Sequence, residues 1–282
     1  MKTWDGLIQA EELLPLLGRA DLVVVDCRFD LTDPHAGEQA WLSAHIAGAR
    51  YADLDLDLSD HSQAGHGRHP LPKANALCQR LAAWGISPAH QVVAYDADDG
   101  AMAAARLWAM LRLLGHRRVA VLDGGLRRWQ ALGLAVDNCA VSARPTQYEA
   151  TFDTTAVIST AQVLARLHEQ PAWLIDARAG ARFRGEVEPI DAVAGHVPGA
   201  INRPYSDNLA ADGRFLAADI LRAQFRALLG DRNEDVAVMC GSGVTACHHL
   251  LAMHVAGISA VQLYADSWSG WISDPTRPVA TS

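Results

Sequence analysis

The chain repeats itself once, and this repeat constrains its fold more than any other feature. The segment "LVVVDCR" of the first half is matched by "AWLIDAR" in the second, and "AHIAGAR" is matched by "GHVPGAI". Asp176 lies 150 positions after Asp26, and Trp271 lies 142 positions after Trp129. A period this long indicates two domains of one fold rather than a solenoid of short repeats.

Each half alternates short β-branched runs with longer helical ones. In the first half, residues 22–28, 90–100 and 117–125 are predicted as strands, and residues 101–115 as a helix that stops at a glycine. In the second half, residues 172–178 form the predicted strand that matches 22–28. Strands that alternate with helices predict an α/β fold, with a parallel sheet flanked by helices in each domain.

A polar, irregular stretch at 138–154 separates the two halves and is a natural linker. We therefore predict an N-terminal domain over 1–142, a linker over 143–155 and a C-terminal domain over 156–282. A length of 282 residues fits two domains of ordinary size.

The composition argues against several classes of partner. Half of the residues are hydrophobic, 20% are charged and the net charge is −8, so no surface for nucleic acid or an anionic membrane is expected. The most apolar window contains Arg106 and Arg112 and is too short to span a bilayer. The N-terminal stretch resembles no export signal. The five cysteines follow no disulfide framework, so we expect reduced thiols in a cytoplasmic protein.

One turn distinguishes the two halves. The run "VAVMCGSGVTACHH" ends a predicted strand on Cys240, whereas the matching turn of the first half carries Asp96. Gly241 and Gly243 allow a tight turn with inward amides, and a helix predicted over 246–255 begins at once. Inward amides and a helix N-terminus both favour a thiolate, so Cys240 is a candidate nucleophile. A buried strand-end cysteine beside a plain turn is the alternative interpretation.

The clustered histidines do not have metal-site spacing. Cys247, His248, His249 and His254 fall on one predicted helix, where two ligands need a spacing of three or four to share a face. Cys247 and His254 are seven apart, so we expect a structural helix and no metal. The chain has no glycine-rich phosphate loop ending in Lys-Ser or Lys-Thr, and we expect no cofactor.

Three motifs resemble a known family. "CGSGVTACH", "GHVPGAIN" and "DARAGARFRG", together with the tandem repeat, are similar to the two-domain rhodanese family of sulfurtransferases, and the resemblance covers nearly the whole chain. The loop "CGSGVT" matches the 3-mercaptopyruvate sulfurtransferases of that family better than the more basic loop of its thiosulfate sulfurtransferases. The resemblance implies two tandem rhodanese-like domains, of which only the C-terminal one keeps the cysteine.

The resemblance also implies a chemistry. Cys240 accepts a sulfane sulfur from a small anionic donor, 3-mercaptopyruvate or thiosulfate, and becomes a persulfide. It then passes the sulfur to cyanide or a thiol, which a thioredoxin-like protein can supply. A ring of amides around the loop would stabilise the charged outer sulfur, as an oxyanion hole stabilises oxygen. This ring includes Gly241, Gly243, Val244 and Thr245.

Three further residues gain roles from the resemblance or from the chemistry. Asp55 matches an acid that faces the cysteine loop, and His69 matches a histidine at the interdomain cleft. Ser242 would donate to the leaving group or relay a proton to it. The alternative interpretations are solvated loops for Asp55 and His69, and a turn-completing role for Ser242.

The arginines of "DARAGARFRG" have different predicted roles. Arg182 matches the arginine that binds the carboxylate or sulfonate of the donor, a task that suits a guanidinium. Arg178 is expected to order the strand end beside Asp176, and Arg184 to lie in solvent.

The chain departs from the family pattern at two places. Ile190 stands in "EPI" where the family usually has "EPR", so a second arginine is missing, and we consider Arg203 as its substitute. "YADSW" replaces "YDGSW". We expect the tryptophans at 129, 268 and 271 to be core or wall residues, and Trp268 and Tyr264 are also considered as lining of the pocket. The neutral loop favours mercaptopyruvate as the donor, whereas the missing arginine leaves the preference open.

Two other functions compete with the sulfurtransferase. A cysteine phosphatase needs an arginine six residues after its cysteine, but that position is Ala246 here. A non-enzymatic persulfide carrier or redox module would keep Cys240 but would not turn over a small donor.

Overall fold

A computed structural model describes residues 2–169, 173–230 and 235–281, so the predicted strand at 172–178 begins on a residue outside the described chain. The chain divides into two compact units. The first comprises Met1–Asp60, Leu71–Asp153 and Ala211–Phe215, and the second comprises His61–Pro70, Thr154–Ala210 and Leu216–Ser282. Domains over 1–142 and 156–282 remain our proposal for the division along the sequence.

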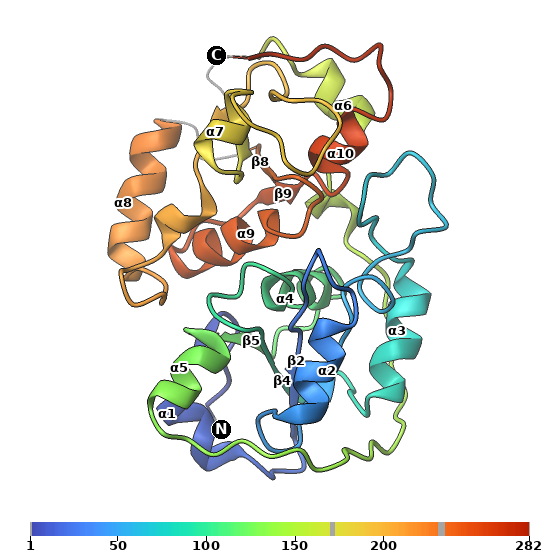
Figure 1. Cartoon of the computed structure of the whole chain (residues 1–282), viewed down its shortest axis with the longest axis vertical. Coiled ribbons are helices and arrows are strands. Elements are labelled where there is room, and N and C mark those ends of the chain that lie inside the picture. The colour runs from blue at the N-terminus through green and yellow to red at the C-terminus, as the bar shows by residue number, and fades with distance from the viewer. Residues whose placement is uncertain (1, 170–172, 231–234, 282) are drawn as a thin grey trace. The chain divides into compact units, whose positions relative to one another are not determined.

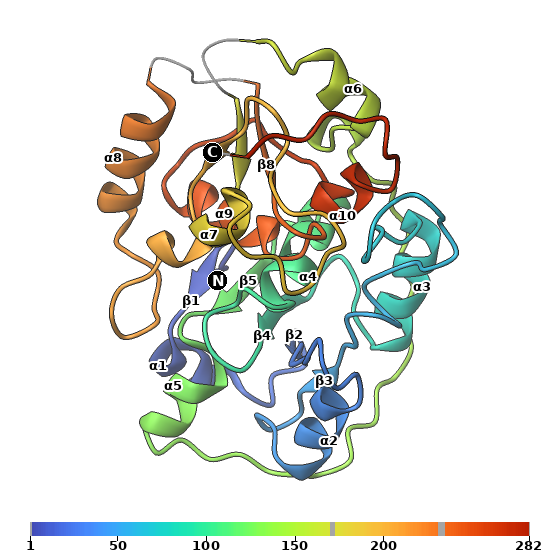
Figure 2. The same ribbon diagram turned by 45° about the horizontal axis from the view of Figure 1, so that its top comes forward.

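The first unit is built on a parallel sheet with the strand order β1-β5-β4-β2-β3. Its central strand β4 is buried along its whole length, as expected for a parallel sheet covered on both faces. Helices α1 and α5 share one hydrophobic core with residues of β1, β2, β4 and β5 (Figure 1, Figure 2). The elements are β1 Leu7–Ile8, α1 Ala10–Leu13, β2 Leu22–Asp26, α2 Ala36–Ser43, β3 Arg50–Tyr51, α3 Ala74–Ala83, β4 Gln91–Tyr95, α4 Ala104–Leu113, β5 Val119–Leu122 and α5 Gly125–Ala131.

The second unit contains a parallel sheet with the order β7-β6-β8-β9. Helix α8 lies on one side of these strands, and α6 and α10 lie on the other (Figure 1, Figure 2). The elements are α6 Thr160–Ala165, β6 Leu174–Asp176, α7 Gly180–Phe183, β7 Ile201–Asn202, α8 Ala218–Leu229, β8 Val236–Met239, α9 Ala246–Val255, β9 Val261–Leu263 and α10 Ser267–Trp271. None of the helices within the described residues is long and apolar enough to cross a membrane.

The two sheets have the same topology, which confirms the predicted tandem α/β fold. The order β3-β2-β4-β5 of the first unit matches β7-β6-β8-β9 of the second, and the place of β1 beside β5 is taken in the second unit by an isolated parallel bridge between Val157 and Leu263. Both β2 and β6 end on an aspartate that pairs with the arginine two residues on. The closest N–O distance is 2.7 Å for Arg28 and Asp26 and 2.7 Å for Arg178 and Asp176. The predicted role of Arg178 at the strand end is therefore confirmed.

Matching aromatic residues fill the two cores. Trp129 is fully buried in the first unit, and Trp268, Trp271 and Tyr264 are fully buried in the second. Of the two places considered for Tyr264 and Trp268, the core and the pocket lining, the structure puts both side chains in the core, where they are fully buried. The indole of Trp268 donates to the carbonyl of Val193 at 2.9 Å, so its polar atom is satisfied inside the unit.

Candidate active site

Cys240 follows directly on β8, a strand whose residues are all buried. The cysteine is 3% exposed. Its amide donates to the hydroxyl of Ser267 at 3.0 Å, and its carbonyl accepts from the amide of Trp268 at 3.0 Å. Both bonds join Cys240 to the first two residues of α10. They hold the thiol at the carboxyl end of a parallel sheet, the edge at which open α/β folds place their sites.

The turn after Cys240 is tight and closely packed. Gly243 has a φ of +76°, and a side-chain carbon there would lie 2.3 Å from the carbonyl oxygen of Ala265. The carbonyl of Gly241 accepts from the amide of Ser269 at 2.8 Å. Helix α9 begins immediately after Thr245, which confirms the helix predicted over 246–255. The N-terminal end of a ten-residue helix is thus joined directly to the cysteine loop.

Ser242 and His69 are joined by a hydrogen bond. The hydroxyl oxygen of Ser242 lies 2.7 Å from Nδ1 of His69, and both residues are buried. His69 is therefore not a solvated loop residue, and the hydroxyl of Ser242 does more than complete the turn. A buried hydroxyl and imidazole in contact form a short path along which a proton can move.

The segment that carries His69 belongs to the second unit, although it lies in the first half of the sequence. Gly67, with a φ of +82°, is so close to Asp266 and Gly270 that a side-chain carbon there would lie 2.7 Å from the Asp266 carbonyl. The amide of Arg68 donates to the hydroxyl of Ser269 at 3.0 Å. This close packing on α10 fixes the backbone at Gly67 and Arg68, directly before His69.

Arg182 extends from α7 into a pair of acids beside the cysteine loop. Its guanidinium donates to Glu188 at 2.6 Å and to Asp191 at 3.1 Å. A side-chain carbon at Gly241 would lie 3.7 Å from Nη2 of Arg182, so the guanidinium also faces the residue after Cys240. Burial disfavours the Glu188 carboxylate, but hydrogen bonds from Arg182 and two backbone amides outweigh it, and the pKa of Glu188 lies below its ordinary value. The ion pair therefore fixes Arg182 against the loop.

Arg68 is a second cation at this place, and the sequence analysis missed it. Its Nη2 lies 3.3 Å from the position of a side-chain carbon on Gly241, and its Nη1 bonds to Asp191. Ile190, which stands where the family usually has its second arginine, is 46% exposed. The sequence contains one indication of this role, because Arg68 directly precedes the predicted site residue His69.

Two other arginines have partners elsewhere. Arg203 is buried, and its guanidinium donates to Asn208 at 3.1 Å and to Gln224 at 2.7 Å. It therefore stabilises the interior of the second unit and is not the substitute for the missing arginine. Arg184 is exposed and pairs with Glu186 at 2.7 Å, as expected of a solvated arginine.

Asp55 lies in the first unit, in the turn after β3. The carboxylate of Asp53 accepts from the amides of Asp55 at 2.8 Å and Leu56 at 3.0 Å, and so orders the turn. Asp55 itself is half-buried. Its role toward the cysteine stays a prediction.

The counterpart turn of the first unit directs backbone amides at an acidic side chain. One carboxylate oxygen of Asp96 accepts from the amide of Gly100 at 2.9 Å, and the other accepts from the amide of Met102 at 3.2 Å. The turn therefore surrounds a negatively charged side chain with backbone amides. Burial nevertheless raises the pKa of Asp96 to about 6, because it exceeds the stabilisation from these amides.

Comparison with known proteins agrees with this geometry. The Rhodanese-like domain matches the chain twice, at residues 9–132 and 159–274. A probable 3-mercaptopyruvate sulfurtransferase of Pseudomonas aeruginosa is 50% identical over 278 residues, which cover 98% of each chain. A Mycobacterium tuberculosis protein provisionally named thiosulfate sulfurtransferase SseB is 41% identical over 282 residues, covering 97% of this chain and 96% of its own. The crystal structure of the 3-mercaptopyruvate sulfotransferase SseA from Escherichia coli is 32% identical, with a TM-score of 0.79, and covers 95% of this chain and 100% of that one.

The chain therefore belongs to the family of proteins with rhodanese-like domains and carries two of them. Its relatives along the whole length are sulfurtransferases, and the chain is an enzyme of that class. The relatives are named for different sulfur donors, so the names alone do not select one.

Proposed function

We propose that this protein transfers sulfur from 3-mercaptopyruvate through a persulfide on Cys240 to a thiol or to cyanide. The Cys240 thiolate attacks the sulfur of the donor, the new S–S bond forms, and the C–S bond of the donor breaks. The electron pair of that bond leaves as the enolate of pyruvate, which takes up a proton. An acceptor thiolate then attacks the outer sulfur, the S–S bond breaks, and the Cys240 thiolate is restored.

The hydrogen bond between Ser242 and His69 is the observation that carries the choice of donor. The pyruvate enolate needs a proton, whereas the sulfite released from thiosulfate is already a stable anion. Ser242 lies two residues after Cys240, and its oxygen is 2.7 Å from Nδ1 of His69. We therefore assign the relay of this proton to Ser242 and His69.

The two arginines beside Gly241 support binding of an anionic donor. Arg182 and Arg68 both face Gly241, and Asp191 bonds to both. We propose that the carboxylate of mercaptopyruvate binds to the free edges of these guanidinium groups, because planar guanidinium and carboxylate groups match in geometry. Arg68 would then supply the charge that Ile190 does not.

We assign stabilisation of the persulfide to the backbone amides of the cysteine loop. Gly241, Gly243, Val244 and Thr245 are the residues of this ring, and the first-unit turn offers a precedent in the amides that surround the Asp96 carboxylate. An anionic outer sulfur in the same kind of turn would receive the same stabilisation. We keep Asp55 as a proposed contribution from the first domain.

We further propose a thioredoxin-like protein or a small thiol as the acceptor, and a cytoplasmic location. The transfer needs Cys240 as a free thiol, and all five cysteines are free in the structure. A reducing compartment preserves such thiols.

The test is turnover with a small donor. We expect many turnovers with 3-mercaptopyruvate and a dithiol, none in Cys240→Ser, and a mass increase of one sulfur atom on Cys240 when the acceptor is omitted. Ser242→Ala should slow the reaction with mercaptopyruvate much more than any reaction with thiosulfate. Sulfur uptake from a partner protein alone would instead favour the persulfide carrier, and a Cys240-dependent hydrolysis of an aryl phosphate would favour the phosphatase.

A further inference from the structure

The first unit contains a pocket that the proposed reaction does not use. Its volume is about 420 Å³, which lies in the range of sites for small organic molecules. It lies where β2, β3 and β4 begin, at the opposite edge of the sheet from Asp96. All of its lining residues belong to the first unit, whereas Cys240 belongs to the second.

The pocket is lined by cations. The cations are Arg19, Arg50 and Arg144, His90 adds an imidazole to the lining, and no aspartate or glutamate is among the lining residues in the described chain. Arg19 is neutralised by Asp21, with which it makes two bonds of 2.9 and 2.8 Å. Within the described residues, Arg50 and Arg144 have no such acidic partner.

Two of the three guanidinium nitrogens of Arg50 bond to backbone carbonyls. Its Nε donates to the carbonyl of Trp84 at 2.8 Å and its Nη1 to the carbonyl of Gly48 at 3.1 Å. Trp84 follows the last residue of α3, and a cation is favourable at the C-terminal end of a helix. Nη2 lies beside Gly85, where a side-chain carbon would be 3.7 Å away. Burial lowers the pKa of Arg50, so the surrounding groups do not fully compensate its charge.

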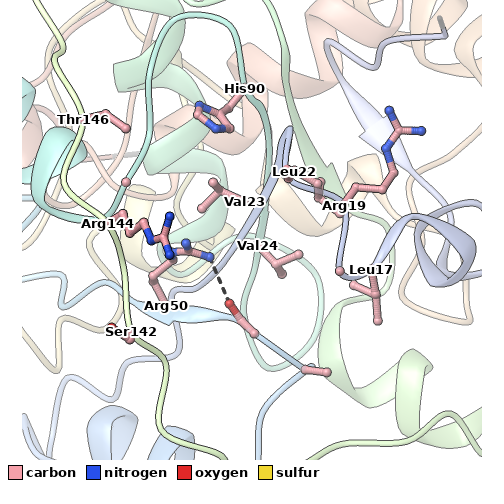
Figure 3. Close-up of a pocket in the computed structure, with 15 residues that line it drawn as sticks. Leu17, Arg19, Leu22, Val23, Val24, Arg50, His90, Ser142, Arg144 and Thr146 are labelled. Atoms are coloured by element: carbon pink, nitrogen blue, oxygen red, sulfur yellow. Dashed lines mark hydrogen bonds between the residues drawn. The ribbon is translucent and has the colours of Figure 1, made fainter.

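Arg144 has a fixed backbone but no partner for its side chain. Its carbonyl lies 2.9 Å from the position of a side-chain carbon on Gly85, and the amide of Thr146 donates to Ala82 at 2.9 Å. Within the described residues its guanidinium makes no hydrogen bond or ion pair. Figure 3 shows Arg50 and Arg144 on the same side of the pocket, where the Arg144 carbonyl and Nη2 of Arg50 both approach Gly85. Like charges in one pocket repel each other, and a bound anion would relieve that repulsion.

The remaining walls add a hydrogen-bond donor and an apolar surface. Nδ1 of His90 accepts from the amide of Ser87 at 3.0 Å, so the neutral ring carries its proton on Nε2. Leu17, Leu22 and Val24 form an apolar part of the lining. A ligand that suits both parts has a charged head and a carbon body.

We propose that this pocket binds a small organic dianion, such as a phosphomonoester, with its charged head between Arg50 and Arg144. Its carbon body contacts the apolar wall. Arg144 is held for this contact by the backbone bond of Thr146, and Arg50 by its bonds to two carbonyls. Two guanidinium groups in this arrangement bind phosphate or paired carboxylate oxygens through charge-assisted hydrogen bonds.

Titration of the full chain with phenyl phosphate tests this proposal. We expect saturable shifts of the backbone amide signals of Gly48 and Gly85 in NMR spectra, weaker binding of inorganic phosphate, and no binding of phenol. Arg144→Gln, which removes an exposed side chain without a partner, should weaken binding about tenfold to a hundredfold. Arg50→Gln should weaken it as well. Both variants should keep the sulfurtransferase activity.

Arg117→Gln is the matched control, because Arg117 is an exposed arginine of the same unit outside the pocket. It should bind phenyl phosphate like the wild type. Equal affinities of Arg144→Gln and Arg117→Gln would overturn the proposal. Shifts confined to Gly241 and Gly243 would also overturn it, since they would place the anion at the cysteine loop. Inorganic phosphate that binds as tightly as phenyl phosphate would refute the role of the apolar wall.

Discussion

His69 Nδ1 lies 2.7 Å from the hydroxyl oxygen of Ser242, although the two residues are 173 positions apart in the chain. Both are buried within the second unit. The contact depends on the segment 61–70, which packs on α10 through Gly67 and Gly270. A residue from the first half of the sequence thereby becomes part of the cysteine site.

Removal of either member of this pair should slow the reaction with mercaptopyruvate. We expect His69→Ala and Ser242→Ala each to lower kcat about a hundredfold to ten-thousandfold, the range that general acid–base catalysis contributes. The double variant should be little slower than either single variant, because both remove the same proton path. Steady-state kinetics of the four proteins measures this. Multiplicative losses would show that the two side chains act independently.

Loss of Arg68 should weaken binding of the donor. We expect Arg68→Gln to raise KM for mercaptopyruvate about tenfold, because one charged contact to the carboxylate is removed. Arg184→Gln is the matched control, since Arg184 is exposed and pairs with Glu186. The double variant Arg68→Gln with Ile190→Arg should recover part of the lost affinity by restoring a cation at the position expected from the family. An unchanged KM in Arg68→Gln would rule out a role for this residue in donor binding.

Gly243→Ala should destabilise the second unit more than an alanine at an open left-handed glycine. Gly115 has a φ of +78° with no atom within 4 Å of an added side-chain carbon, so Gly115→Ala should cost only the backbone term of about 1–2 kcal/mol. At Gly243 the same carbon would lie 2.3 Å from the Ala265 carbonyl, and overpacking should add about 1–3 kcal/mol. Urea unfolding of both variants compares the two effects. Equal shifts of the midpoint would refute the close approach at Gly243.

Asp96 should make the stability of the first unit depend on pH. The pKa of Asp96 is raised from 3.8 to about 6 in the folded chain, so folding favours the protonated acid. Its contribution is present below pH 3.8 and is lost as the pH rises through 6.

Asp96→Asn removes this titration. The stability of the variant relative to the wild type should therefore rise between pH 4 and pH 6.5, by about 2 kcal/mol. Urea unfolding of both proteins at several pH values measures the difference. A difference that stays constant over this range would contradict the raised pKa.

Much of the fold could be predicted from local features of the sequence. β-branched runs that end on Asp26 and Asp176 predict buried parallel strands, and the structure pairs each aspartate with the arginine two residues on. The start of α9 after Thr245 followed from the glycine turn and the apolar run beyond it. Side chains that act within a few residues of each other leave a pattern that can be read along the chain.

The sequence by itself determined the tandem α/β fold, the end of β8 directly before Cys240 and the glycine turn that follows it. The tertiary structure alone decided which distant residues join that turn. It placed Arg68 beside Gly241, excluded Arg203 by burying it against Asn208, and put Tyr264 in the core. Strand patterns and turns follow from local sterics and hydrophobic periodicity, whereas these contacts depend on how separate segments pack, and the spacing of residues along the chain does not encode that packing.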